Sequence, residues 1–262
     1  MQASVRKELH DNGAAGRTAT VIIDNTAKLN TLNSPLMLQL TGCIEALARD
    51  PALRAVVLRG GGTQAFIGGA DIREMARLNA ATAETFISTL HRCCMALRRL
   101  PVPVIARIQG YALGAGLEIA AACDLRIASE DSRFGMPEVR VGIPSVIEAA
   151  LLPRLIGWGR TRRLLFTGEM IEAPTAQAWG LVEELAAPAE LDAVTNRTVQ
   201  AILKAGPTAI RLQKALMREW EEVPLEEAVR RGIGYFSHAW ETKEPQRMMQ
   251  AFLDVGKERK RS

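Results

Sequence analysis

Two glutamates, Glu118 and Glu138, lie among residues that could place a carboxylate in a pocket. Glu118 follows the small residues of 110–117, which are expected to begin a helix, and Glu138 follows residues 133–137, which are expected to turn after a short strand. Apolar surroundings disfavour the charged form of a carboxyl group, which suits it to proton transfer. Two such groups facing one pocket could hold a water molecule and add it across a bond. The simpler alternative is an ordinary helix residue and a solvated turn residue.

A third segment, residues 64–75, predicts exposed backbone N–H groups. It follows an apolar run that is expected to be a strand, and its adjacent Gly68 and Gly69 give the backbone freedom just before a helix begins. Asp71 is expected to cap that helix rather than to catalyse. Because residues 113–116 begin another helix, N–H donors from two helix starts could form an oxyanion hole, which binds a carbonyl oxygen that gains charge.

Segments from three parts of the chain resemble the enoyl-CoA hydratase/isomerase family, also called the crotonase family. They are residues 65–75, 103–124 and 134–144. The most specific match covers residues 108–125, and the resemblance extends over nearly the whole chain. It implies a coenzyme A thioester substrate whose carbonyl oxygen is held by two backbone N–H groups, which stabilise an enolate-like state.

The resemblance assigns roles to individual residues. The thioester oxygen is expected between the N–H groups of Ala70 and Ala115. In members that hydrate a double bond, the glutamate matching Glu138 exchanges the proton at the carbon next to the carbonyl, and the one matching Glu118 orients or activates the water. No metal is implied, and no cofactor apart from coenzyme A, which is part of the substrate. Substrate contacts are expected from Ala27, Lys28, Leu29, Gly68, Asp71, Ile72, Gly114, Pro137 and Ser145.

The segment matching the nucleotide-binding region contains Lys28, which could equally be an ordinary surface lysine. A second open point is the departure from the family pattern after Glu138. Many hydratases continue with Gly-Leu-Ile-Pro and a glycine-rich helix start, whereas residues 141–148 read Val-Gly-Ile-Pro-Ser-Val-Ile-Glu, one residue shorter and without the glycine run. Ser145 could present its backbone N–H, and its hydroxyl could cap the following helix.

Glu148 ends this departing segment. It is either a further pocket carboxylate or an acid favoured early in a helix by the helix dipole, and the second interpretation is preferred. The departure bears on the acyl group and on the type of reaction rather than on the fold.

The alternation of strands and helices predicts an α/β core. Ser34 and Pro35 are expected to open the first long helix, with Pro35 at its first position, and a second helix is expected over residues 82–100. Short apolar runs predict strands over residues 19–24, 55–59, 104–108 and 125–128. Beyond Pro144 the strand signal fades, and helices are expected around residues 145–156, 159–167, 174–179, 188–204, 207–220, 224–240 and 244–255.

The resemblance specifies the core as a crotonase-like spiral of strand-strand-helix turns over residues 1–200. An all-helical C-terminal region is expected over residues 201–262. In the family that region packs across neighbouring subunits, so we expect a homotrimer or homohexamer. Candidates for core or interface anchors are Trp158, Trp179, Trp220 and Trp240.

Composition fits a soluble enzyme. The chain has 262 residues, 48% of them hydrophobic, and no apolar run reaches the roughly 20 residues of a membrane helix. Without an apolar signal core near the first residues, a cytoplasmic location is expected. The net charge of +4 would help an anionic coenzyme A to approach, but the basic residues form no concentrated patch for nucleic acid. The four cysteines lack metal-ligand spacing, and the three histidines match no catalytic motif.

The sequence therefore predicts an enoyl-CoA hydratase, which adds water syn to a 2-enoyl-CoA thioester and gives a 3-hydroxyacyl-CoA. The close alternative is an isomerase or another enolate reaction on an acyl-CoA, because the altered segment after Pro144 could reshape the acyl pocket. A non-enzymatic alternative is an acyl-CoA- or RNA-binding relative. The presence of both Glu118 and Glu138 argues against that alternative.

Overall fold

The computed structural model describes the backbone of residues 3–258 and the side chains of residues 3–254. The chain divides into two compact units, Met1–Val199 and Gln200–Ser262.

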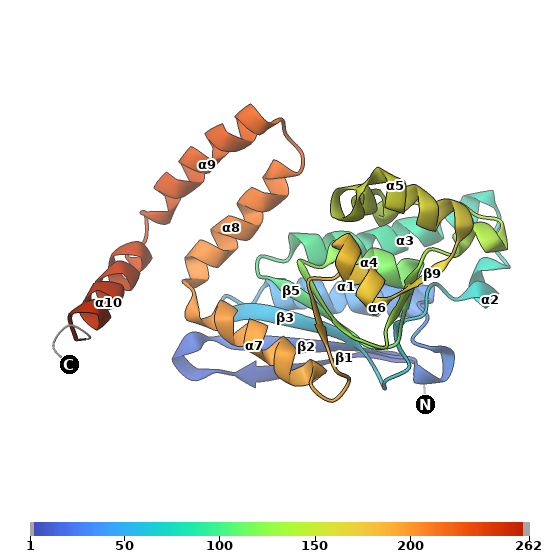
Figure 1. Cartoon of the computed structure of the whole chain (residues 1–262), viewed down its shortest axis with the longest axis horizontal. Helices are drawn as coiled ribbons and strands as arrows, with labels where there is room; N and C mark the ends of the chain where they lie inside the picture. Colours follow the sequence, from blue (N-terminus) through green and yellow to red (C-terminus); the bar gives the residue numbers. More distant parts are fainter. Residues whose placement is uncertain (1–2, 259–262) are drawn as a thin grey trace. The chain divides into compact units, whose positions relative to one another are not determined.

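The first unit contains a six-stranded sheet in the order β1-β2-β3-β5-β7-β10 (Figure 1). Its strands are β1 (Ser4–Asp11), β2 (Arg17–Asp24), β3 (Leu53–Gly60), β5 (Val104–Ile108), β7 (Leu125–Ser129) and β10 (Glu184–Ala186). Only β1 runs antiparallel to its neighbour, and all the other pairs are parallel. Every residue of β5 is buried, as expected for a parallel strand covered on both faces.

A second, four-stranded sheet positions the loops that matter for function. Its strands are β4 (Ala65–Ile67), β6 (Tyr111–Leu113), β8 (Arg133–Gly135) and β9 (Met170–Glu172), in the order β4-β6-β8-β9. The first three are mutually parallel. They follow β3, β5 and β7 in turn, so each turn of the chain contributes one strand to each sheet. The carboxyl ends of β4, β6 and β8 therefore meet at one edge.

Helices follow these strands and cover the sheets. They are α1 (Ser34–Ala48), α2 (Ile72–Met75), α3 (Ala80–Arg99), α4 (Ala115–Ala122), α5 (Leu152–Thr167) and α6 (Ala173–Trp179). Short 3-10 turns are η1 (Gly13–Ala15), η2 (Thr26–Lys28), η3 (Glu138–Val141) and η4 (Ile147–Leu151). Figure 1 shows α1, α3 and α4 on the same side of the six-stranded sheet. All eight residues of α4 are buried, which makes it the central helix of the core.

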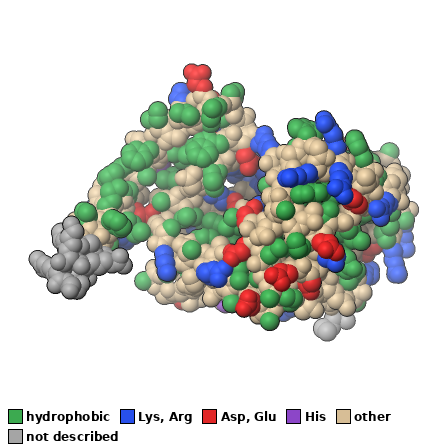
Figure 2. All heavy atoms as spheres, in the orientation of Figure 1, with side chains coloured by type: hydrophobic (Ala, Val, Ile, Leu, Met, Phe, Trp, Pro, Cys, Tyr) green, Lys and Arg blue, Asp and Glu red, His purple; other side chains and the backbone are tan. Residues whose placement is uncertain are grey.

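The last part of the chain is helical. It comprises α7 (Leu191–Lys204), α8 (Pro207–Trp220), α9 (Leu225–Ala239) and α10 (Glu244–Glu258). Polar contacts within Gln200–Ser262 include Tyr235 Oη, which donates to Glu219 at 2.7 Å, and Glu244, which accepts from the N–H of Thr208 at 3.0 Å. Hydrophobic side chains remain exposed on these helices (Figure 2). Ile233, Phe236 and Phe252 are 71%, 69% and 80% exposed.

The expected elements are largely confirmed. All four predicted strands lie within β2, β3, β5 and β7, and the helix expected over residues 82–100 is α3. The prediction that strands end at Pro144 was wrong, because β9 and β10 follow it. Each has three residues, too few for a local pattern. Ser34 and Pro35 begin α1 as expected, with Asn33 as the N-cap and Pro35 in the first turn.

No helix within residues 3–258 combines the length and apolar character needed to cross a membrane. The four cysteines are free thiols, and three of them are buried.

Asn30 holds the loop before α1 in place. It has a left-handed backbone, with φ of 55°, and is 1% exposed. Its Nδ2 donates to the carbonyls of Gly61 at 2.9 Å and Ala65 at 2.7 Å, and its Oδ1 accepts from the Asn25 N–H at 2.9 Å. This loop leads to Leu32, which pairs with Ala70.

We expect Asn30→Ala to lower the free energy of unfolding by roughly 2–4 kcal/mol, because it leaves buried polar groups without partners and because alanine tolerates the left-handed backbone less well than asparagine does. Urea denaturation at fixed protein concentration measures the change. Asn30→Gly removes the same hydrogen bonds but relieves the backbone, so it should cost less than alanine. A loss below about 0.5 kcal/mol for Asn30→Ala would contradict this account.

Candidate active site

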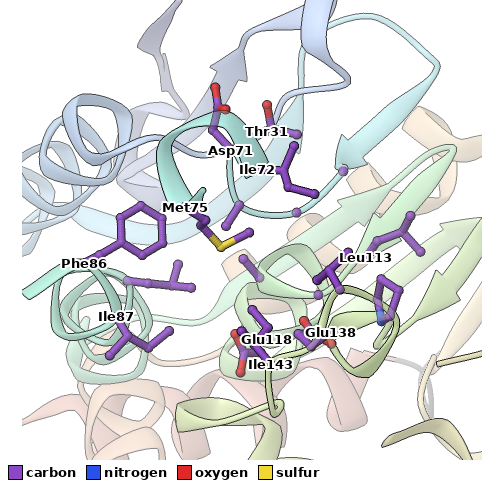
Figure 3. Close-up of a pocket in the computed structure, with 18 of the residues that line it drawn as sticks. Thr31, Asp71, Ile72, Met75, Phe86, Ile87, Leu113, Glu118, Glu138 and Ile143 are labelled. Atoms are coloured by element: carbon purple, nitrogen blue, oxygen red, sulfur yellow. The ribbon is translucent and has the colours of Figure 1, made fainter. Parts of the chain in front are cut away.

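A cavity of about 450 Å³ opens where the carboxyl ends of β4, β6 and β8 meet (Figure 3). Ten of the residues expected at the site line it: Lys28, Gly68, Ala70, Asp71, Ile72, Gly114, Ala115, Glu118, Pro137 and Glu138. Three do not: Ala27, Leu29 and Ser145. The structure thus brings together residues that come from three separate turns of the chain.

Two backbone N–H groups are left unpaired at this cavity. Ala70 and Leu32 form a β-bridge, but its hydrogen bonds do not use the N–H of Ala70. The N–H of Leu32 donates to the carbonyl of Gly69, and the N–H of Asp71 donates to the carbonyl of Leu32. The N–H of Ala70 itself therefore faces away from that pairing. Ala115 is the first residue of α4, where N–H groups have no partner within the helix. Among the residues that the structure describes, neither N–H has a hydrogen-bond acceptor.

Gly114 allows a carboxylate to lie directly beside this pair. Its φ is 50°, and a Cβ built on it would lie 2.4 Å from Oε1 of Glu138. A side chain at position 114 would therefore displace Glu138. Glycine here keeps the second acid against the start of α4, next to the N–H of Ala115.

Glu118 is the more buried of the two acids, at 4% exposure. Its Oε1 accepts a hydrogen bond from the N–H of Ala149 at 3.2 Å. Burial, followed by the charge of Glu138, raises the pKa of Glu118 to about 8. Glu118 is therefore largely a neutral acid at pH 7.

Glu138 begins η3 and is partly exposed. Burial raises its pKa, while a hydrogen bond from the Ser145 hydroxyl to its Oε2, at 2.8 Å, opposes the rise. Because that bond stabilises the charged form, Glu138 is the ionised partner when Glu118 holds a proton. The pair thus offers one hydrogen-bond donor and one proton acceptor to the same cavity.

The rest of the wall is mainly apolar and comes partly from α3. Figure 3 shows Met75, Phe86 and Ile87 across the cavity from Leu113 and Glu138. Such a wall suits a hydrocarbon group.

At the mouth Lys28 Nζ lies 3.1 Å from Asp71 Oδ2. Asp71 also caps α2, with Oδ1 accepting from the N–H of Arg73 at 2.9 Å. The prediction that Asp71 is a cap is confirmed.

Two expectations about the altered segment need correction. Ser145 does not cap the following helix, because Val146 is the N-cap of η4 and the Ser145 hydroxyl is bonded to Glu138. Glu148 does lie in the first turn of η4, yet it is buried and bonded to His91, so the helix dipole alone does not account for it. The contact between His91 and Glu148 has no local sequence signal, since the two residues are 57 positions apart.

Comparisons with known proteins agree with this arrangement. The family model described as "Enoyl-CoA hydratase/isomerase" matches residues 14–260. A short-chain-enoyl-CoA hydratase from Clostridium acetobutylicum and a crotonyl-CoA hydratase from Syntrophomonas wolfei are each 34% identical, over 92% of this chain and 93% of the relative. Crystal structures of enoyl-CoA hydratases from Bacillus anthracis and Mycobacterium smegmatis superpose with TM-scores of 0.89 and 0.91, at 30% and 29% identity, over 97% of both chains in each comparison. The fold expected from the sequence is confirmed.

The raised pKa of Glu118 has a consequence for stability. When the pH rises above 4.5, the ordinary pKa, Glu118 loses its proton in the unfolded chain but keeps it in the fold until about pH 8. The folded state then binds more protons, so stability falls as the pH rises through this range.

We expect Glu118→Gln to remove this penalty and to raise stability at pH 8 by roughly 1–3 kcal/mol relative to the unmodified chain, with little gain at pH 4.5. Thermal unfolding at the two pH values measures the difference. Glu84→Gln, at an exposed position of α3, is the control and should show no such trend. A gain from Glu118→Gln that is equal at both pH values would show that the penalty does not arise from ionisation.

Proposed function

The chain belongs to the enoyl-CoA hydratase/isomerase family, and from this membership and the geometry of the cavity we propose that it adds water syn to a 2-enoyl-CoA thioester, giving a 3-hydroxyacyl-CoA. The observation that carries the proposal is the meeting of two carboxyl groups and two unpaired N–H groups in one cavity. The N–H groups suit a carbonyl oxygen that gains charge, and the carboxyl groups suit a water molecule.

In this proposal the thioester oxygen accepts hydrogen bonds from the N–H groups of Ala70 and Ala115. Addition of hydroxide at C3 moves the electrons of the double bond toward that oxygen and gives an enolate. Donors that are already in place stabilise the new charge without reorganising. Each is worth about 3–4 kcal/mol in comparable sites.

The two acids handle the water. Neutral Glu118 donates a hydrogen bond that orients it, and ionised Glu138 takes one of its protons while the oxygen forms its bond to C3. When the enolate collapses, Glu138 delivers that proton to C2. Both new bonds come from one water on one face of the double bond, so the addition is syn. Each acid ends the cycle in the protonation state in which it began.

The remaining contacts orient the substrate. We assign the acyl group to the apolar wall that includes Phe86 and Ile87. We assign the anionic coenzyme A to the mouth of the cavity at Lys28. Next to Lys28 in the chain, Ala27 lies in η2 and Leu29 directly follows it. Hydration needs only water and the thioester, so we propose no additional cofactor. Four free thiols suit a reducing compartment, which supports a cytoplasmic location.

The activity assay should use a short 2-enoyl-CoA and follow the loss of absorbance of its conjugated double bond. We expect Glu138→Gln, which cannot take up a proton, and Glu118→Ala, which removes the hydrogen bond to the water, to lower kcat by roughly 10² to 10⁴-fold each. Substrate binding should change little. Glu84→Gln again serves as the control.

The products separate the competing reactions. Formation of a 3-hydroxyacyl-CoA supports hydration, whereas a shifted double bond without uptake of water would indicate an isomerase. Binding of the thioester without any turnover would indicate a non-catalytic relative. Near-normal activity of Glu138→Gln or of Glu118→Ala would remove that glutamate from the mechanism.

We further propose that a second copy of this chain covers the exposed apolar side chains of α9 and α10, giving a homotrimer or homohexamer. Ile233 and Phe236 lie three positions apart on α9 and are therefore on one face of the helix. Charged side chains at these two positions would be buried in the proposed apolar interface between subunits.

We expect the double variant Ile233→Glu, Phe236→Glu to sediment as a smaller species than the unmodified chain, because burying two carboxylates opposes association. Analytical ultracentrifugation measures this. Leu9→Glu, on the exposed side of β1, is the control. An unmodified chain that sediments as a monomer would contradict the assembly.

A further inference from the structure

A buried acid outside the proposed mechanism lies directly behind Glu118. Glu148 is 6% exposed and does not line the cavity. Its Oε1 lies 2.9 Å from Nδ1 of His91, and the Cys94 thiol of α3 interacts with the same carboxylate. Burying a carboxylate is costly even where it has partners, so a packing role alone does not explain this residue.

Glu148 is tied to Glu118 through one peptide group. The residue that follows it, Ala149, donates its N–H to Oε1 of Glu118 at 3.2 Å. The bond from His91 to Glu148 therefore also fixes the donor that holds Glu118. Any shift of Glu148 would move that donor.

The backbone before Glu148 is strained. Ile147 has a φ of 38°, a left-handed value that is unusual for a β-branched residue. Such a conformation costs on the order of 1–3 kcal/mol and persists only when the surroundings fix it. Here the fixing contacts are those of Glu148 with His91 and of Ala149 with Glu118.

Ionisable groups face Glu118 from three elements. Glu138 faces it from η3, Glu148 from η4 and the Cys94 thiol from α3. Burial, followed by the charges of Glu148 and Glu118, holds the pKa of the Cys94 thiol well above its usual range, so this group stays neutral. The negative charge of Glu148 is thus one of the two that oppose ionisation of Glu118, and His91 is the group that faces Glu148 from α3.

We propose that Glu148, held by His91, is a positioning residue that keeps Glu118 in its neutral form and aimed at the water. This inference rests on the proposed function, because it concerns the role of Glu118 in hydration. Glu148 itself touches neither substrate nor water in this account. Its effect passes through its charge and through the peptide that it shares with Ala149.

Two variants test the effect of the Glu148 charge on Glu118, one by removing the charge and one by placing a cation beside it. Glu148→Gln removes the negative charge behind Glu118. His91→Lys instead places a permanent cation beside Glu148, at a side chain that is 47% exposed and on a helix that tolerates lysine. Both changes make ionisation of Glu118 easier, so both should lower the pH at which Glu118 loses its proton.

The measurement is kcat and KM for a short 2-enoyl-CoA between pH 5 and 10. In the unmodified enzyme we expect kcat to fall as the pH rises through about 8, the pKa of Glu118. In both variants this fall should move to lower pH, by on the order of one unit, with KM nearly unchanged. Glu148→Asp keeps the charge and should leave the midpoint closer to that of the unmodified enzyme. Glu84→Gln, an exposed charge change on α3, should leave the profile in place.

The outcomes distinguish the two proposals. If the unmodified enzyme has no hydratase activity, the proposed function fails. The second case is an active unmodified enzyme. If the His91→Lys and Glu148→Gln variants both fold and keep the midpoint of its pH profile, the role of Glu148 is overturned while the proposed function stands. A uniform loss of kcat at every pH, with the midpoint unmoved, would likewise reduce Glu148 to a packing role. Because His91→Lys leaves the buried acid in place, it tests the inference even if Glu148→Gln does not fold.

Discussion

The close approach of α4 to β4 is the constraint on which the site depends. A Cβ on Gly116 would lie 2.1 Å from the carbonyl oxygen of Ile67, so only glycine lets the helix backbone meet the strand. This contact places the first N–H of α4 near the loop that follows β4, and it is why Ala70 and Ala115 reach one cavity. A larger residue at position 116 would push the helix away and separate the two donors.

Burying two acids together creates a chemical difference between them without any metal. Burial raises the pKa of both Glu118 and Glu138. Glu118 is more deeply buried, whereas the charge of Glu138 is stabilised by the Ser145 hydroxyl. Their mutual repulsion allows one proton to stay with the pair. The same arrangement weakens the fold at higher pH, which is the usual conflict between a functional site and stability.

Local sequence patterns predicted the elements whose structure depends on interactions between residues close in the chain. The apolar runs of β3 and β5 and the cap formed by Asp71 depend on neighbouring residues, and their predictions hold. The three-residue strands β9 and β10 depend on pairing with distant strands, so no local pattern shows them. For the site, sequence similarity located Glu118 and Glu138, but the contact between His91 and Glu148 follows only from the packing of α3 against η4.

The segment of residues 145–149 shows why its departure from the family pattern leaves the cavity complete. Its first residue, Ser145, donates its hydroxyl to Glu138, and its last, Ala149, donates its N–H to Glu118. One short segment therefore holds both acids. Ile147 takes a left-handed conformation that glycine adopts without strain, and bonds on either side of it must offset the cost. The contact of Glu148 with His91 supplies such a bond.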